Sequence, residues 1–169
     1  MIKVFDHGSN FFVEPVADRI QDAIEKLRPG LTLTTKHLEE MDLIERMVLV
    51  ERHLVSRELA LGSGPRVVAF DESEAISLMG NEEDHLRIQV VKSGYRLEEA
   101  WQEMDQLEKS IDGELQFAFD QKFGYLTACP TNVGTGIRVS VMLHLPALKM
   151  AGQMEKVLRA ARDLQLAVR

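Results

Sequence analysis

The sequence predicts an α+β fold in which a mainly antiparallel β-sheet is flanked by α-helices. Three short candidate strands follow one another closely between residues 66 and 91, and such spacing favours antiparallel neighbours. A long amphipathic helix pattern covers residues 97–118. Strands and helices intermix without a regular βαβ rhythm, which argues against a parallel sheet. The length of 169 residues and the hydrophobic content of 45% predict a single domain, residues 1–169, with a substantial core.

The first part of the chain predicts two helices. Pro15 opens a helix that runs to about Leu27, and Pro29-Gly30 ends it. A second helix is predicted from about Leu38 to Val55, followed by the loop Gly62–Pro65. Residues 1–14 are ambiguous, although Met1–Phe5 fits a short strand.

Alternating or β-branched segments predict the strands of the sheet. They are Arg66–Phe70, Ala75–Met79, His85–Val91, Phe123–Ala128 and Ile137–Leu145. Helices are predicted over Leu97–Ala118 and over about Pro146–Leu164. The last residues, Leu166–Arg169, fit the beginning of a further strand.

Period-two alternation gives two of these strands one apolar face and one polar face. Arg87 shares a face with His85 and Gln89, and Arg138 shares a face with Ser140 and His144. If these strands lie in one sheet together with Arg169, guanidinium groups converge on its polar face. Such a cluster suits phosphate, because the guanidinium fork matches phosphate oxygens. On pattern alone an alternative stays open, since arginines on a polar sheet face are commonly ion-paired surface residues.

Charge and cysteine content restrict the class of protein. The net charge of −7 argues against non-specific binding to nucleic acid or to an anionic membrane surface. One cysteine allows no intrachain disulfide and makes a cysteine-based zinc site a poor expectation, so no metal ligands are predicted. The single cysteine fits a reducing setting, so we expect a cytoplasmic protein. No apolar run has the length of a membrane span, and the N-terminus lacks a signal-peptide pattern.

Two stretches are far more specific than this general pattern. Residues 81–87 are Asn-Glu-Glu-Asp-His-Leu-Arg, and residues 129–138 are Cys-Pro-Thr-Asn-Val-Gly-Thr-Gly-Ile-Arg. In this order they closely resemble the ATP:guanido phosphotransferases, a family that includes creatine kinases, arginine kinases and bacterial protein-arginine kinases. The segments 49–56, 124–127 and 140–146 look most like the bacterial branch. The resemblance covers about residues 40–169 and implies the catalytic-domain sheet of guanido kinases, which is of the glutamine-synthetase type.

The resemblance implies a function for each matching position. Glu83 resembles the carboxylate that grips the substrate guanidinium and helps to take its proton, and Cys129 resembles the cysteine beside that guanidinium. The implied nucleotide site has a histidine against the base and three arginines on the phosphates: His53, Arg87, Arg138 and Arg169. Magnesium is expected to arrive with ATP, held by phosphates and water.

Alternatives stay open at several of these positions. Cys129 also fits a plain buried cysteine, and His53 fits a cation at the end of a helix. Glu82 and Asp84 are expected to be turn or network residues.

The implied reaction is transfer of the ATP γ-phosphoryl group to a guanidino nitrogen, foremost of arginine residues in proteins, with free arginine as an alternative substrate. Two family segments, an early Ser-x-Arg-x-Arg and a later Gly-x-x-Gly-Glu, find no match in the 169 residues. We therefore expect a catalytic domain that is incomplete at both ends and has severely reduced turnover. A catalytically dead nucleotide-binding or regulatory module is the rival interpretation. An open sheet edge would then allow pairing with another chain or homo-oligomerisation.

Overall fold

The computed structural model describes residues 13–26 and 31–168. The chain forms two compact units that meet in sequence at Val139 and Ser140. The number of independent domains stays a prediction. The first unit carries the sheet and both sequence motifs, and the second unit carries two short helices. Among the described residues, no helix is both long and apolar enough to cross a bilayer.

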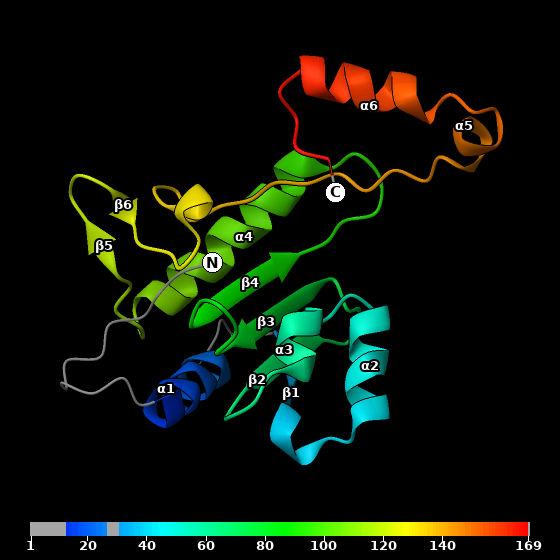
Figure 1. Cartoon of the computed structure of the whole chain (residues 1–169). Helices are drawn as coiled ribbons and strands as arrows, with labels where there is room; N and C mark the ends of the chain where they lie inside the picture. The colour runs from blue at the N-terminus through cyan, green and yellow to red at the C-terminus, as the bar shows by residue number, and fades with distance from the viewer. Residues whose placement is uncertain (1–12, 27–30, 169) are drawn as a thin grey trace. The chain divides into compact units, whose positions relative to one another are not determined.

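A four-stranded antiparallel meander forms the centre of the first unit (Figure 1). Its strands, in spatial and chain order, are β1 (Leu33–His37), β2 (Val67–Asp71), β3 (Ile76–Gly80) and β4 (Leu86–Val90). The register places Met79 opposite Arg87 and Ser77 opposite Gln89. The α+β class with an antiparallel sheet is thus confirmed, and β2, β3 and β4 lie where the alternation predicted them. The strand β1 was not predicted.

Helices cover both faces of this sheet. Helix α1 (Val13–Glu25) and helix α4 (Leu97–Asp112) pack on one face, and helices α2 (Leu43–Glu51) and α3 (Arg57–Leu61) pack on the other (Figure 1). All five residues of β3 are buried because this strand is central and covered on both sides. Alternate residues of β2 and β3 therefore enter two different apolar clusters, for example Leu78 on the α1 side and Met79 on the α2 side.

A capping box explains why the predicted helix over Leu38–Val55 is wrong as a single element. The segment begins with a 3-10 turn, Leu38–Glu40, and the α-helix starts only after Asp42. The Glu45 N–H donates to Asp42 Oδ1 at 2.8 Å, and the Asp42 N–H donates to Glu45 Oε2 at 2.9 Å. This reciprocal pair satisfies two free amides and fixes the helix start. The helix ends before His53, whose φ of 61° is left-handed.

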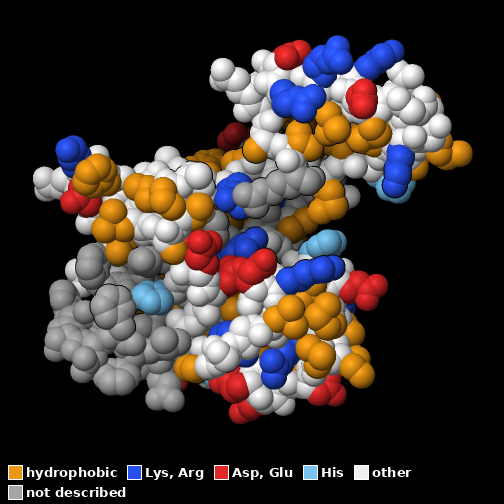
Figure 2. Space-filling view, viewed as in Figure 1, with side chains coloured by type: hydrophobic (Ala, Val, Ile, Leu, Met, Phe, Trp, Pro, Cys, Tyr) orange, Lys and Arg blue, Asp and Glu red, His pale blue; other side chains and the backbone are white. Residues whose placement is uncertain are grey.

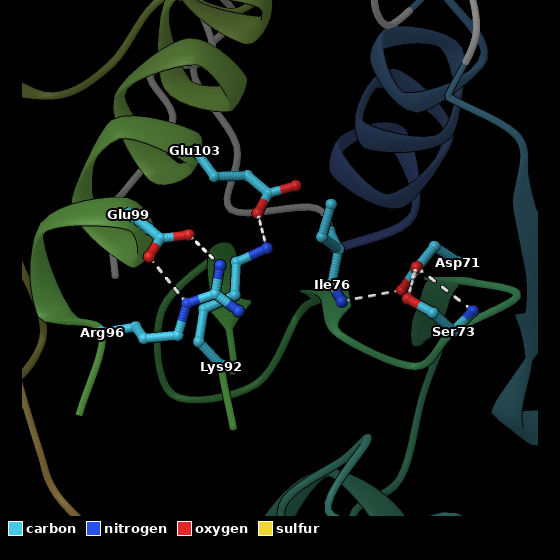
Figure 3. A network of polar contacts seen from close by, with 7 residues as sticks. All are labelled: Asp71, Ser73, Ile76, Lys92, Arg96, Glu99 and Glu103. Atoms are coloured by element: carbon cyan, nitrogen blue, oxygen red, sulfur yellow. Dashed lines mark hydrogen bonds and ion pairs between the residues drawn. The ribbon is translucent and has the colours of Figure 1, made fainter. Parts of the chain in front are cut away.

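Hydrogen bonds and ion pairs stabilise the β2–β3 turn and the connection from β4 to α4 (Figure 3). In the β2–β3 turn, Asp71 accepts hydrogen bonds from the backbone of Ile76 at 2.7 Å and of Ser73 at 3.2 Å. Burial acts to raise the pKa of Asp71, but these bonds and the Ser73 hydroxyl outweigh it and lower the pKa. Lys92 pairs with Glu103, and Arg96 with Glu99, which fastens the β4–α4 connection to α4.

The chain after α4 is less regular than the sequence predicts. The helix ends at Asp112 rather than at Ala118, and the predicted strand Phe123–Ala128 shortens to β6 (Gly124–Tyr125), which pairs with β5 (Phe119–Asp120). Gly124 has a φ of 77°, and a Cβ there would lie 2.5 Å from the Gly134 carbonyl oxygen. Glycine is therefore required where this hairpin meets the second motif. A 3-10 turn, η2 (Pro130–Asn132), follows.

The predicted strand Ile137–Leu145 is wrong, because this segment has no regular secondary structure. Its alternation specifies an extended chain, but a strand also needs hydrogen-bonding partners, and β4 pairs only with β3 among the described residues. The predicted helix Pro146–Leu164 divides into α5 (Pro146–Met150) and α6 (Met154–Asp163) around Gly152, whose φ is 65°. Residues 166–168 form no strand, and Arg169 lies outside the described residues.

Candidate functional site

A cavity of about 820 Å³ opens beside β4 on the face that carries α2 and α3. The strand contributes Arg87 and Gln89, the turn after α2 contributes His53, and the start of α3 contributes Arg57. Exposed apolar residues of α2 form another wall, namely Ile44, Met47 and Val48. Figure 2 shows these hydrophobic side chains over α2 next to basic and histidine side chains. The cavity thus combines an apolar wall from α2 with polar side chains that include Arg57, Arg87 and Glu51.

The alternation of β4 aims Arg87 and Gln89 into this cavity. Their neighbours Leu86, Ile88 and Val90 pack into the opposite apolar cluster. The Arg87 side chain is 30% exposed, and its Nη1 lies 3.3 Å from Glu82 Oε2. The Glu82 side chain is only 7% exposed, so this ion pair is shielded from solvent on the acid's side. Arg87 is therefore held by a carboxylate while part of its fork remains open.

His53 reaches the cavity through an unusual backbone conformation. Its left-handed φ of 61° follows directly after α2. The Gln89 side chain fixes this turn by donating from Nε2 to the His53 carbonyl oxygen at 2.8 Å. The His53 side chain itself is exposed. Left-handed non-glycine residues cost energy and often lie at functional sites, so the conformation is a reason to look for a function here.

The first motif forms a tight loop between β3 and β4. The Asn81 N–H donates to the His85 carbonyl at 2.9 Å, and Asn81 Nδ2 donates to the Pro65 carbonyl at 3.1 Å. Within this loop Glu83 is exposed, whereas its neighbours Glu82 and Asp84 have buried side chains. The loop therefore offers the carboxylate of Glu83 to solvent and keeps its other two acids for internal contacts.

The second motif folds around η2 and holds Cys129 and Arg138. The Thr127 hydroxyl donates to the Cys129 carbonyl at 2.7 Å, and Cys129 Sγ lies 3.0 Å from Thr131 Oγ1. The cysteine is half-buried, so its interpretation as a plain buried cysteine loses support. Arg138 is exposed, and its Nη2 donates to Asn132 Oδ1 at 3.2 Å. Asn132 is 5% exposed, and the sequence reasoning missed it.

A hydrogen bond joins the first motif to Ala128, the residue immediately before the second motif. The backbone N–H of Ala128 donates to Asp84 Oδ1 at 2.6 Å across 44 residues of sequence. Asp84 is thus a network residue, as the sequence reasoning expected. Asp84 and Glu83 are adjacent acids, so no local sequence feature tells which of them is buried.

The structure brings some predicted site residues together and leaves others apart. His53 and Arg87 line one cavity. Cys129 and Arg138 lie on one loop, and the loop that carries Glu83 is bonded to it. Arg138 does not lie on a strand, so the predicted cluster of guanidinium groups on a single sheet is not formed by the described residues. Arg169 lies outside them. The roles of all six residues stay predictions.

Carboxylate clusters suited to a metal ion are absent from the described residues. No group of three or more His, Cys, Asp or Glu side chains converges there.

Comparison with a family model places almost the whole chain in one known domain type. The model for the C-terminal catalytic domain of ATP:guanido phosphotransferases matches residues 15–169. A protein-arginine kinase of Moorella thermoacetica is 50% identical over 137 residues, which are 81% of this chain and 39% of that protein. A protein-arginine kinase of Brevibacillus brevis is 48% identical over 145 residues, which are 86% of this chain and 41% of that protein. The chain therefore spans about two-fifths of the length of these relatives.

Two solved kinase structures share the fold. The taurocyamine kinase of Schistosoma mansoni with bound transition-state-analogue components superposes with a TM-score of 0.68 and 22% identity, covering 79% of this chain and 22% of that one. A lombricine kinase gives a TM-score of 0.58 and 21% identity over 72% of this chain and 38% of that one. At this level of identity the likeness concerns the fold alone.

Proposed function

The chain belongs to the ATP:guanido phosphotransferase family, and from that premise we propose that it forms the nucleotide-binding core of a protein-arginine kinase. The reaction transfers the γ-phosphoryl group of ATP to a guanidino nitrogen of an arginine residue in a protein. A bond from that nitrogen to phosphorus forms, the bond from the γ-phosphorus to the bridging oxygen breaks, and ADP leaves. The names of the bacterial relatives support the choice of protein arginine over free arginine.

The observation that carries this proposal is the shared cavity of His53 and Arg87. Its volume of about 820 Å³ lies within the range typical of small-molecule sites, about 300–1,000 Å³. Arg87 would bind phosphate oxygens through its open fork, and His53 would lie against the base. The apolar wall of α2 would add contact area for the base. Arg138 and Arg169 would complete the phosphate clamp.

The acceptor half of the site would use Glu83 and Cys129. A guanidinium is a poor nucleophile until it is oriented and loses a proton, and a carboxylate accepts both its fork and that proton. Glu83 is exposed, so the side chain of a substrate protein can reach it. Mg²⁺ would enter with ATP and neutralise the developing phosphate charge. We place this reaction in the cytoplasm, because the single cysteine suits a reducing compartment.

Titration calorimetry with Mg-ATP tests the nucleotide site. Arg87→Ala is expected to weaken binding about 10- to 100-fold, because a hydrogen bond to a charged group contributes about 1.5–3 kcal/mol. Arg87→Lys keeps the charge but loses the fork, so an intermediate loss is expected. The matched control is Arg52→Ala, an exposed arginine paired with Glu74 that does not line the cavity. Its affinity for ATP should stay within about twofold, as a surface ion pair contributes little.

Two results would contradict this function. Equal ATP affinity in the Arg87→Ala protein and the unaltered protein would remove Arg87 from the nucleotide site. Transfer itself is followed as phosphoarginine formed on a basic substrate protein. Because we expect turnover of this chain to be severely reduced, phosphoarginine is measured over long incubation against a control without the protein. ATP binding with no phosphoarginine above that control would favour the rival interpretation, a nucleotide-binding regulatory module.

A further inference from the structure

Asp84 is a buried acid, although the residue that precedes it in the same loop, Glu83, is exposed. The relative exposure of Asp84 is 1%. Aspartate is almost never fully buried unless it is paired or hydrogen-bonded. The nucleotide cavity does not include Asp84 among its lining residues. Its burial therefore calls for a reason other than contact with ATP.

The Asp84 side chain makes its hydrogen bond outside its own loop, next to the second motif. Asp84 Oδ1 accepts a hydrogen bond from the Ala128 N–H at 2.6 Å, and Ala128 immediately precedes Cys129. Asp84 Oδ2 has no hydrogen-bond partner within the described part of the chain. A bond from a backbone amide to a carboxylate is stronger than a neutral one, so this contact is a firm link.

The segment that follows Ala128 is held together by its own hydrogen bonds. The Thr127 hydroxyl and the Asn132 N–H both donate to the Cys129 carbonyl, at 2.7 Å and 3.0 Å. Asn132 in turn accepts from Arg138. A displacement at Ala128 would therefore carry Cys129 and Arg138 with it.

We propose that Asp84 is a positioning residue that fixes the Cys129 loop relative to the carboxylate of Glu83. The inference rests on the proposed function, in which Glu83 and Cys129 contact the same substrate guanidinium. The acid that grips the substrate and the acid that places the thiol loop are then adjacent in the sequence. The link matters for rate because a misplacement of about 1 Å can reduce turnover about 100-fold.

The first test measures the link without any turnover. Amide hydrogen exchange of Ala128 is followed by NMR, and alkylation by iodoacetamide reports on the thiol, since Cys129 is the only cysteine of the chain. In Asp84→Ala we expect Ala128 to exchange about 10-fold faster or more, because its acceptor is gone. We expect Cys129 alkylation to rise about twofold or more as the loop opens locally.

Two variants act as controls for a loss that is merely structural. Asp71→Ala removes another acid that accepts backbone hydrogen bonds in a loop of the same sheet. It should lower stability but leave Ala128 exchange and Cys129 alkylation unchanged. Asp84→Asn keeps an oxygen that can accept from Ala128, so its exchange and alkylation should stay close to those of the unaltered protein.

Several outcomes would overturn the proposal. They are unchanged exchange and alkylation in folded Asp84→Ala, or the same alkylation change in Asp71→Ala. If Asp84→Ala does not fold, fast Ala128 exchange in the unaltered protein or in Asp84→Asn is decisive against it.

Mg-ATP calorimetry on the same proteins separates this inference from the proposed function. Asp84→Ala should bind ATP within about twofold of the unaltered protein and lose kcat about 100-fold. A protein that shows the link but binds no ATP would refute the function and retain the link.

Discussion

The two faces of the four-stranded sheet differ in how far their helix layers reach. On the α1 and α4 side, the apolar cluster takes residues from all four strands, including Leu33 of β1 and Ile88 of β4. On the α2 and α3 side, its strand members come from β2 and β3: Val68, Phe70 and Met79. The second helix layer stops short of β4, so Arg87 and Gln89 face a cavity instead of a core.

The two faces of the sheet thus have different roles: one carries the larger apolar cluster, and the other carries the candidate site. The closed face, on the α1 and α4 side, carries the larger buried apolar cluster, and burial of apolar area stabilises the fold. The open face, on the α2 and α3 side, carries a histidine in a left-handed conformation and an ion pair whose acid is shielded from solvent, and such features cost free energy of folding. Substitutions on the two faces should therefore affect different measurements.

Leu78→Ala gives the largest expected effect on the closed face. Leu78 is fully buried in the α1-side cluster, and such truncations reduce the free energy of unfolding by about 2–5 kcal/mol. The ATP affinity of the folded variant should stay within about twofold, because the cavity lies on the other side. Urea denaturation and calorimetry measure the two quantities.

The neighbouring position on the same strand supplies a control. Ser77 is 1% exposed, and its hydroxyl has no hydrogen-bond partner among the described residues. Ser77→Ala removes a buried polar group and should leave the free energy of unfolding unchanged or raise it by about 1 kcal/mol. A large loss of ATP affinity in folded Leu78→Ala would show that the two faces are coupled.

The sequence alone predicted the polar face of β4. The same reasoning predicted a strand wrongly where the segment has no neighbouring strand to pair with in the described part of the chain. The alternation over His85–Val91 correctly separated Leu86 and Ile88 from Arg87 and Gln89. The alternation over Ile137–Leu145 is equally regular, yet that segment is no strand. Alternation is a local property, whereas strand pairing depends on a distant edge that the segment itself does not specify.

For the candidate site, the sequence predicted individual residues but not the contacts that connect them. The family resemblance indicated which residues the chemistry needs, and two of these residues, His53 and Arg87, line one cavity. The Asp84 link was not predictable, because its partner is a backbone amide 44 residues away. The start of α2 could have been found, since Asp42 and Glu45 have the spacing of a capping box.

The backbone of His53 gives a smaller effect on the open face. At a φ of 61°, a residue with a Cβ is disfavoured, while glycine is not. His53→Gly should therefore be more stable to denaturation than His53→Ala by about 1 kcal/mol. Both variants should lose ATP affinity alike, because both lack the imidazole. Equal stability of the pair would mean that the turn after α2 is unstrained and that this face stores no energy.

The smallest expected effect concerns the rim of the closed face, where Glu108 of α4 accepts from the Tyr125 hydroxyl at 3.3 Å. Burial, followed by the charges of Asp112 and Asp105, raises the pKa of Glu108, against the opposing effects of Tyr125 and Lys109. The folded protein thus binds this proton at a higher pH than the unfolded chain does. Stability must then fall as pH rises from the ordinary glutamate pKa of about 4.3 through the raised value.

Glu108→Gln removes this titration and keeps an oxygen that can accept from Tyr125. The variant should gain stability over the unaltered protein as pH rises toward neutrality, by less than about 1 kcal/mol because solvent screens a half-buried group. Thermal unfolding between pH 4 and 8 measures the difference, with the exposed Glu98→Gln of the same helix as its control. A gain that is independent of pH would mean that the closed face tolerates this charge, and the contrast in polarity between the two faces would then be weaker than the packing indicates.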